Sequence, residues 1–207
     1  MKKRILPLSF SLIAGAALLA GGTAHAQFNL KRLGIGGGGN AATAAAPSSG
    51  GVTQLLQSYV GANQQVLSGQ SSLASAMGMS SAAGQAQQAA GLLSGGVPSA
   101  GTLSQVGSTQ QSLSQTLTQA FSGGGASSAT PVNKQAFTDG LTSLGKGVSQ
   151  YSSLQSGLGS VGQMNPSSLL QSGLNPQTAQ AASYVAQSAP GQLQSLMSTL
   201  TAAVQFA

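Results

Sequence analysis

Residues able to carry acid–base or metal chemistry are very few in this sequence. The chain has one histidine, His25, one acidic residue, Asp139, and no cysteine. A defined metal site needs several His, Cys or carboxylate ligands. Glycoside hydrolysis needs two carboxyl groups, and Ser-His-Asp or Cys-His catalysis needs a histidine beside its nucleophile. Because we expect His25 to be removed with a signal peptide, the composition predicts no metal site, no cofactor site and no such catalytic residues.

One kind of nucleophile chemistry is left, a Ser-Lys or Tyr-Lys dyad around Lys134 or Lys146. Serines are so frequent in this chain that finding one near a lysine carries no information. The simpler interpretation is that both lysines are solvated, with Lys134 near Asp139. An exposed pair of that kind contributes about 0–1 kcal/mol to stability. We therefore expect a protein that is not an enzyme.

Motifs for phosphate and nucleic-acid binding are also missing. No Gly-Lys-Ser/Thr follows the glycines at 36–39, so this segment does not match a phosphate loop. The few scattered cations cannot neutralise many phosphates, which argues against nucleic-acid binding. Tyr59, Tyr151 and Tyr184 fall in apolar stripes, so we expect them to be core residues with their hydroxyls at the rim.

The first 26 residues predict export. Residues 2–4 are basic, residues 5–20 are mostly apolar, and Ala24-His25-Ala26 places small residues where signal peptidase cleaves. We expect cleavage after Ala26 and a periplasmic or secreted mature protein. The alternative is an uncleaved anchor, because the apolar run is about long enough to span a bilayer.

Cleavage would leave a nearly uncharged chain. Its cations would be Lys31, Arg32, Lys134 and Lys146, against the single acid Asp139. Lys31 and Arg32 could touch anionic lipid, but each would contribute only about 1 kcal/mol, which favours a solvated tail. Without cysteine there is no disulfide, so the fold must rest on its core.

Composition divides the remainder into two parts. Residues 27–51 are rich in Gly, Ala and Ser and predict a disordered tether. Residues 52–207 predict one helical domain, with a possible hinge at residues 123–130. The sequence leaves open whether the two helical halves form one bundle or move about this hinge.

Apolar residues recur with helical spacing throughout residues 52–207, and no segment alternates with period two. The clearest seam contains Leu103, Val106, Gln110, Leu113, Leu117 and Ala120, with Gln110 as its polar break. An N-cap residue followed by proline predicts a helix start at three places, Thr130-Pro131, Asn165-Pro166 and Asn175-Pro176. Ser188, with Pro190 in the first turn, predicts a separate last helix with Leu193, Leu196, Met197, Leu200 and Val204 along one face. The predicted fold is an all-α helical bundle.

Glycines complicate this prediction. Gly140, Gly145, Gly147 and Gly157 fall inside predicted helices, where each costs about 1 kcal/mol relative to alanine. Either these helices are interrupted, or the small residues let two helices approach closely.

Several short motifs carry a resemblance. They are Phe137, Gly140-Leu141 and Leu144, then Tyr184-Val185-Ala186 before Pro190, then Thr199-Leu200 and residues 203–207, with Ser94-Gly95 in the first half. These resemble a functionally uncharacterised group of small exported, all-helical proteins of Gram-negative bacteria, although Gln and Ser stand where that group carries Glu and Lys. The resemblance covers residues 52–207, implies a periplasmic helical bundle and assigns no site residue.

Two hypotheses for function follow. The first is an exported, non-enzymatic module that binds a partner protein or an apolar ligand. The second is a self-associating structural protein of the cell envelope or extracellular matrix, because little charge repulsion opposes association. The sequence singles out no catalytic, cofactor, metal or binding residue for either.

Overall fold

The computed structural model describes residues 49–123 and 133–207, which form helices and no strand. The helices are α1 (Ser49–Ala76), α2 (Ser80–Gly91), α3 (Ala100–Phe121), α4 (Lys134–Gly162), α5 (Pro166–Gln171) and α6 (Pro176–Phe206). The all-α prediction is confirmed for this part of the chain. The predicted signal peptide, the tether up to residue 48 and the hinge beyond Gly123 lie outside the described residues. Residues 49–51, expected in the tether, belong to α1.

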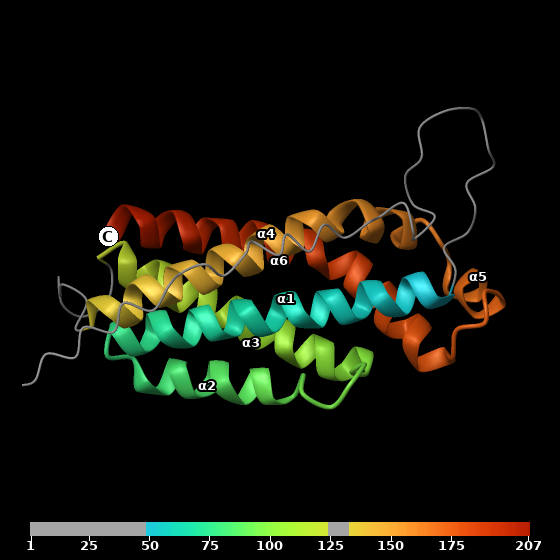
Figure 1. Ribbon diagram of the computed structural model, residues 1–207, viewed down its shortest axis with the longest axis horizontal. Helices are drawn as coiled ribbons and strands as arrows, with labels where there is room; N and C mark the ends of the chain where they lie inside the picture. The colour runs from blue at the N-terminus through green and yellow to red at the C-terminus, as the bar shows by residue number, and fades with distance from the viewer. Residues whose placement is uncertain (1–48, 124–132) are drawn as a thin grey trace, which may run out of the picture.

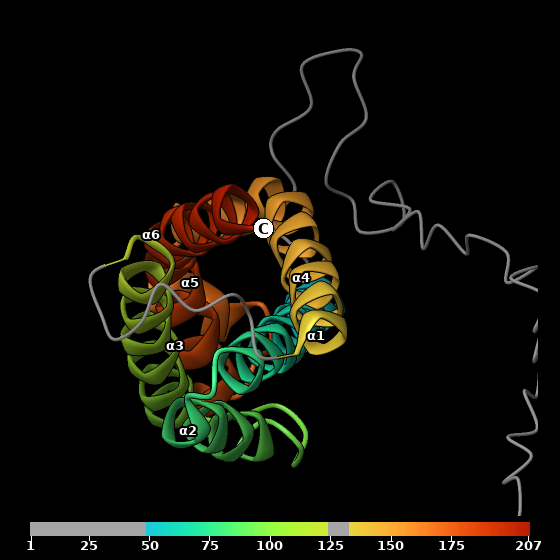
Figure 2. The ribbon, with the colours of Figure 1, turned by 90° about the vertical axis from the view of Figure 1, so that its left-hand side faces the viewer.

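The five long helices form a closed ring (Figures 1 and 2). Helix α4 packs against α1 and α6, α6 packs against α3, and α2 joins α3 to α1. Neighbouring helices run antiparallel, except that α3 and α6 run in the same direction (Figure 1). The short α5 packs on α6 at one end. Because α4 packs on α1 and α6 packs on α3, the two halves of the chain meet along two contacts and form one bundle.

Glycines create the closest helix contact in the bundle, between α1 and α4. A Cβ added to Gly69 would lie 2.6 Å from the backbone nitrogen of Leu144, and one added to Gly140 would lie 2.9 Å from the nitrogen of Leu73. Gly147 meets the nitrogen of Val66 in the same way, at 3.0 Å. Helix α4 is continuous through these glycines. They therefore allow close helix packing rather than interrupting the helix.

Helix starts in the second half agree only in part with the sequence signals. Asn165 and Asn175 cap α5 and α6 as predicted, and each side-chain oxygen accepts from a backbone N–H three residues later at 2.7 Å. Helix α4 is capped by Asn133, whose side chain accepts from the nitrogen of Ala136. The predicted start at Thr130-Pro131 lies outside the described residues.

The prediction of a separate last helix beginning near Ser188 is wrong. Helix α6 continues from Pro176 to Phe206 with Pro190 inside it. An interior proline removes one backbone hydrogen bond and costs about 3 kcal/mol. Pro190 is exposed, while Ala189 and Leu193 on either side of it are buried. Burial on both sides of the proline therefore holds the two halves of α6 in one helix.

The face assigned to the end of α6 is also partly wrong. Leu193 and Leu196 are buried, but Met197 and Val204 are 53% and 59% exposed. The inward positions further along are Thr199 and Ala203. These smaller residues follow the helical period of Leu196 toward the interior, which turns Met197 and Val204 outward.

Aromatic side chains hold one end of the bundle together. Phe121 at the end of α3, Phe137 at the start of α4 and Phe206 at the end of α6 have ring centroids 5.5–5.9 Å apart. Such contacts add about 0.5–1.5 kcal/mol per pair beyond the area they bury.

In the described part of the chain, no helix combines the length and the hydrophobicity that a membrane span needs.

The glycine contact gives a stability prediction. Gly69→Ala should lower the free energy of unfolding by about 1–3 kcal/mol, because the new methyl group meets backbone atoms of α4 that cannot rotate away. Gly145→Ala is the matched control, since no atom lies within 4 Å of its added Cβ. This control should raise stability by about 0.5–1 kcal/mol. Thermal and urea melts followed by circular dichroism measure both; equal effects would contradict the close contact.

Candidate functional site

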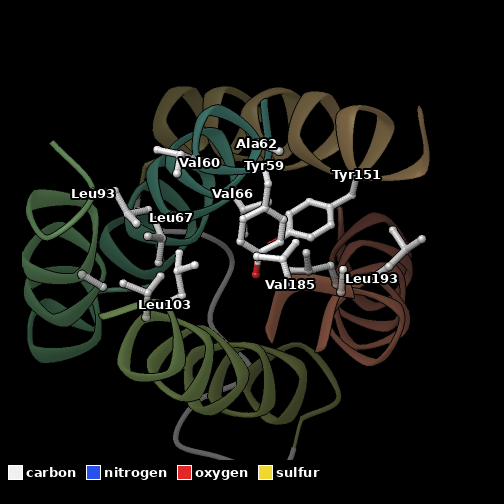
Figure 3. Packing of buried hydrophobic residues seen from close by; sticks show 14 of the residues in the cluster. Tyr59, Val60, Ala62, Val66, Leu67, Leu93, Leu103, Tyr151, Val185 and Leu193 are labelled. Atoms are coloured by element: carbon white, nitrogen blue, oxygen red, sulfur yellow. The ribbon is translucent and has the colours of Figure 1, made fainter. Parts of the chain in front are cut away.

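Two tyrosines and one glutamine connect three helices inside the bundle. The hydroxyls of Tyr59 in α1 and Tyr151 in α4 both donate to Oε1 of Gln192 in α6, at 2.6 and 2.9 Å. Their rings pack edge to face with centroids 5.3 Å apart, and each residue is only 1% exposed. Figure 3 shows the two rings side by side in the interior, close to Val185 of α6. The prediction of core tyrosines is confirmed for both, but their hydroxyls lie inside rather than at the rim.

Burial keeps both phenols protonated. It raises the pKa of Tyr59 above its ordinary value and the pKa of Tyr151 well above it, because the interior disfavours the charged phenolate. Nearby amides, including that of Asn63, act in the opposite direction without overcoming this effect. Both phenols therefore keep their protons at neutral pH and can donate to the oxygen of Gln192, as they do in the structure.

A second set of polar side chains connects α1, α3 and α6. Nε2 of Gln70 donates to the hydroxyl of Ser114 at 2.9 Å and to the backbone oxygen of Gln110 at 3.2 Å. The hydroxyl of Thr199 in α6 donates to the backbone oxygen of Ser114 at 3.3 Å. All of these bonds are between uncharged groups, so each adds only about 0.5–1.5 kcal/mol to stability. They hold α3, which carries Gln110, against both α1 and α6.

Gln110 itself has unsatisfied hydrogen-bonding capacity. Its side chain is 1% exposed, and neither Oε1 nor Nε2 has a hydrogen-bond partner. Its amide lies close enough to Tyr151 to act on the charge of that phenol, but no hydrogen bond joins them. The hydroxyl of Ser188 in α6 is buried and unpartnered as well. A buried, unpaired polar group costs about 1–3 kcal/mol.

Gln110 and Ser188 both belong to the lining of a cavity between α3 and α6. Its volume is about 210 Å³. The lining consists of Gly107, Ser108, Gln110, Gln111 and Ser114 from α3, and of Tyr184, Ser188, Gly191, Gln192, Ser195 and Leu196 from α6. Only Leu196 among these is aliphatic, and none is charged. The cavity is therefore a neutral site whose walls carry hydroxyls and carboxamides.

Gly107 leaves the space that the cavity needs. A Cβ at this position would lie 2.6 Å from Nε2 of Gln192 and 2.7 Å from the hydroxyl of Tyr184. Any other residue at position 107 would therefore push these two polar groups aside. The same distances place the amide nitrogen of Gln192 and the Tyr184 hydroxyl together at the wall formed by α3 and α6.

The charged residues of the described chain lie elsewhere. Lys134, Asp139 and Lys146 are exposed on α4, and the Asp139 carboxylate accepts from Nε2 of Gln135 at 3.0 Å. The sequence predicts Lys134 as the neighbour of Asp139. In the structure the hydrogen bond to Asp139 comes instead from Gln135, which lies one helical turn before Asp139. Neither lysine lines the cavity. No group of three or more His, Cys, Asp or Glu occurs in the part that the structure describes.

Sequence reasoning found one member of this site and missed the others. It identified Gln110 as the polar break in an apolar seam. It gave no sign of Gln192, because glutamine also occupies positions 187, 194 and 205 of the same helix. It interpreted Ser188 as a helix cap, and it grouped Tyr184 with the core. No local pattern distinguishes Gly107 from the many other glycines of the chain.

Known proteins add nothing to this description. Neither protein-family models, nor curated proteins, nor solved structures match the chain. The resemblance of residues 52–207 to exported helical proteins therefore stays a prediction, and the geometry of the site is the basis for proposing a function.

The buried tyrosines predict how stability depends on pH. In the unfolded chain the phenols ionise near pH 10, whereas the folded chain holds them protonated to higher pH. Unfolding therefore releases protons above about pH 10, and the melting temperature should fall as pH rises through that range.

Phenylalanine variants test this assignment. Tyr59→Phe and Tyr151→Phe together should flatten the fall of melting temperature above about pH 10, because they remove the two phenols whose ionisation favours unfolding. Ultraviolet absorbance of tyrosinate, recorded beside circular dichroism, measures ionisation and folding in one titration. Ionisation of both residues near pH 10 with the helical signal intact would contradict their burial.

Proposed function

We propose that the protein is an exported, non-enzymatic helical module, periplasmic or secreted, that binds a small molecule in the cavity between α3 and α6. The observation that carries this proposal is that Gln110 and Ser188 line this cavity and that polar atoms of both side chains are buried without partners in the chain. Buried polar groups in folded proteins are nearly always hydrogen-bonded. A bound polar molecule would supply the missing bonds.

The position of Gln110 supports binding over a purely structural role. It occupies a seam whose neighbouring positions hold Leu103, Val106, Leu113 and Leu117, all buried. A leucine there would continue the apolar face and remove an unsatisfied amide. Functional sites are where a chain departs from the residue that stability alone would favour. The hydroxyls and carboxamides in a lining that also has apolar surface favour a small molecule with polar groups over the purely apolar ligand expected from the sequence.

Closing the cavity tests this proposal. Gly107→Ala places a methyl group against Gln192 and Tyr184, so small molecules that bind the wild-type protein should lose most of their binding. A fragment screen by ligand-observed NMR on both proteins measures this. Gly101→Ala is the control on the same helix, because its added Cβ meets only Ser99, at 3.8 Å. Ser188→Val fills the cavity from α6 if Gly107→Ala proves unstable. Fragments that bind all variants equally would contradict the proposal.

A second candidate is self-association, which the outer face of α6 favours. Met197 and Val204, seven residues apart, are the most exposed of the large apolar side chains in the described residues. Met197 also lines an open groove of about 660 Å³, together with residues that include Pro190, Leu193 and Ala202. The scarcity of charge leaves little repulsion between copies of the chain.

Sedimentation velocity at rising protein concentration tests this second candidate. The wild-type protein should form larger species as concentration rises, and Met197→Gln with Val204→Gln should return it toward the monomer by removing the apolar contact. Leu92→Gln, another exposed apolar position, is the control and should leave association unchanged. A wild-type protein that stays monomeric throughout would exclude association through α6.

A further inference from the structure

The orientation of Gln192 defines what the cavity offers to a ligand. Its Oε1 accepts from both tyrosine hydroxyls, which leaves the amide nitrogen on the side away from the tyrosines. The Nε2 group is held toward Gly107 and the cavity, where it acts as a donor.

Gln110 offers the complementary pair on the facing helix. Its Oε1 and Nε2 are both unpartnered, so one carboxamide presents an acceptor and a donor side by side. The group that satisfies both atoms has a donor and an acceptor in the same arrangement. A carboxamide does this, and so does a pair of vicinal hydroxyls, since each hydroxyl donates and accepts.

Charge narrows the class of ligand further. No charged residue lines the cavity, and every polar group on its wall is a hydroxyl, a carboxamide or backbone. An ionic ligand would leave its water shell without gaining a counter-charge, and that transfer is strongly unfavourable.

The size of the cavity limits the size of the ligand. The cavity volume of about 210 Å³ has room for roughly seven water-sized groups at about 30 Å³ each.

From these observations, and resting on the proposed function, we propose that the ligand is a small neutral molecule carrying a carboxamide or vicinal hydroxyls. An acceptor atom of the ligand accepts a hydrogen bond from Nε2 of Gln192. A neighbouring donor and acceptor of the ligand form hydrogen bonds with Oε1 and Nε2 of Gln110. The two tyrosines position Gln192 and do not touch the ligand.

Three isosteric probes test the chemistry directly. Acetamide is neutral with a donor and an acceptor, acetate is its anion with acceptors only, and acetamidinium is its cation with donors only. Acetamide should bind about tenfold or more tightly than either ion, because only it satisfies Gln110 without bringing an unpaired charge into the cavity. Shifts of the Gln110 and Gln192 side-chain amide signals in nitrogen-15 NMR titrations of the purified protein measure binding. Glycerol, as a fourth probe, shows whether vicinal hydroxyls serve as well.

A single substitution separates binding from folding. Gln110→Leu should abolish acetamide binding while the melting temperature stays the same or rises, because the variant removes two unsatisfied polar atoms from an apolar seam. Gln115→Leu, exposed on the same helix, should leave binding unchanged. A melting temperature that falls by several degrees in Gln110→Leu would show that the amide has a structural role and would overturn the assignment.

The outcomes distinguish this inference from the proposed function beneath it. If either ion binds as well as acetamide, or acetamide binding survives Gln110→Leu, the ligand class is wrong. If no neutral probe binds, while other fragments bind the wild-type protein and lose binding in Gly107→Ala, the cavity binds a ligand of another chemical class. If Gly107→Ala weakens the binding of no fragment, the proposed function fails as well.

Discussion

The amide oxygen of Gln192 accepts hydrogen bonds from Tyr59 and Tyr151, and this contact joins α6 to α1 and α4 inside the bundle. Both phenols stay protonated because burial raises their pKa values, so both remain donors. In the structure the amide oxygen faces the two hydroxyls, and the amide nitrogen is directed to the cavity beside α3. The interaction that holds the core together thus also sets the chemistry of the cavity wall.

The tyrosine pair depends in turn on the close approach of α1 and α4. Gly147 contacts the backbone of Val66 on one side of the pair, and Gly157 contacts the side chain of Leu55 on the other. Between these contacts the helices are near enough for two large rings to pack edge to face in the interior. Larger residues at Gly69, Gly140 or Gly147 would separate the helix axes and with them the two hydroxyls. Close backbone packing and the internal hydrogen bonds are therefore parts of one arrangement.

Neutrality is the common property of the interior and the cavity. Burying a carboxylate or an ammonium group demands a paired charge, whereas a hydroxyl or carboxamide needs only a hydrogen-bond partner. This chain has almost no charged groups to bury, and its interior uses Tyr, Gln, Ser and Thr in their place. Most of these groups are paired across helices, and those left unpaired include the two at the cavity. A protein built in this way is suited to recognising neutral polar groups rather than ions.

The sequence by itself determined the features that depend on near neighbours. Helical periodicity predicted the all-α class, Asn165 and Asn175 before proline predicted two helix starts, and the seam of α3 singled out Gln110. Only the tertiary structure decided that α6 continues through Pro190, that Gly140 and Gly147 meet α1 while Gly145 does not, and that Gln192 rather than Gln194 turns inward. The physical reason is distance along the chain. Gln192 bonds to residues 133 and 41 positions away, and in a chain rich in glutamine no local pattern selects the one that has those partners.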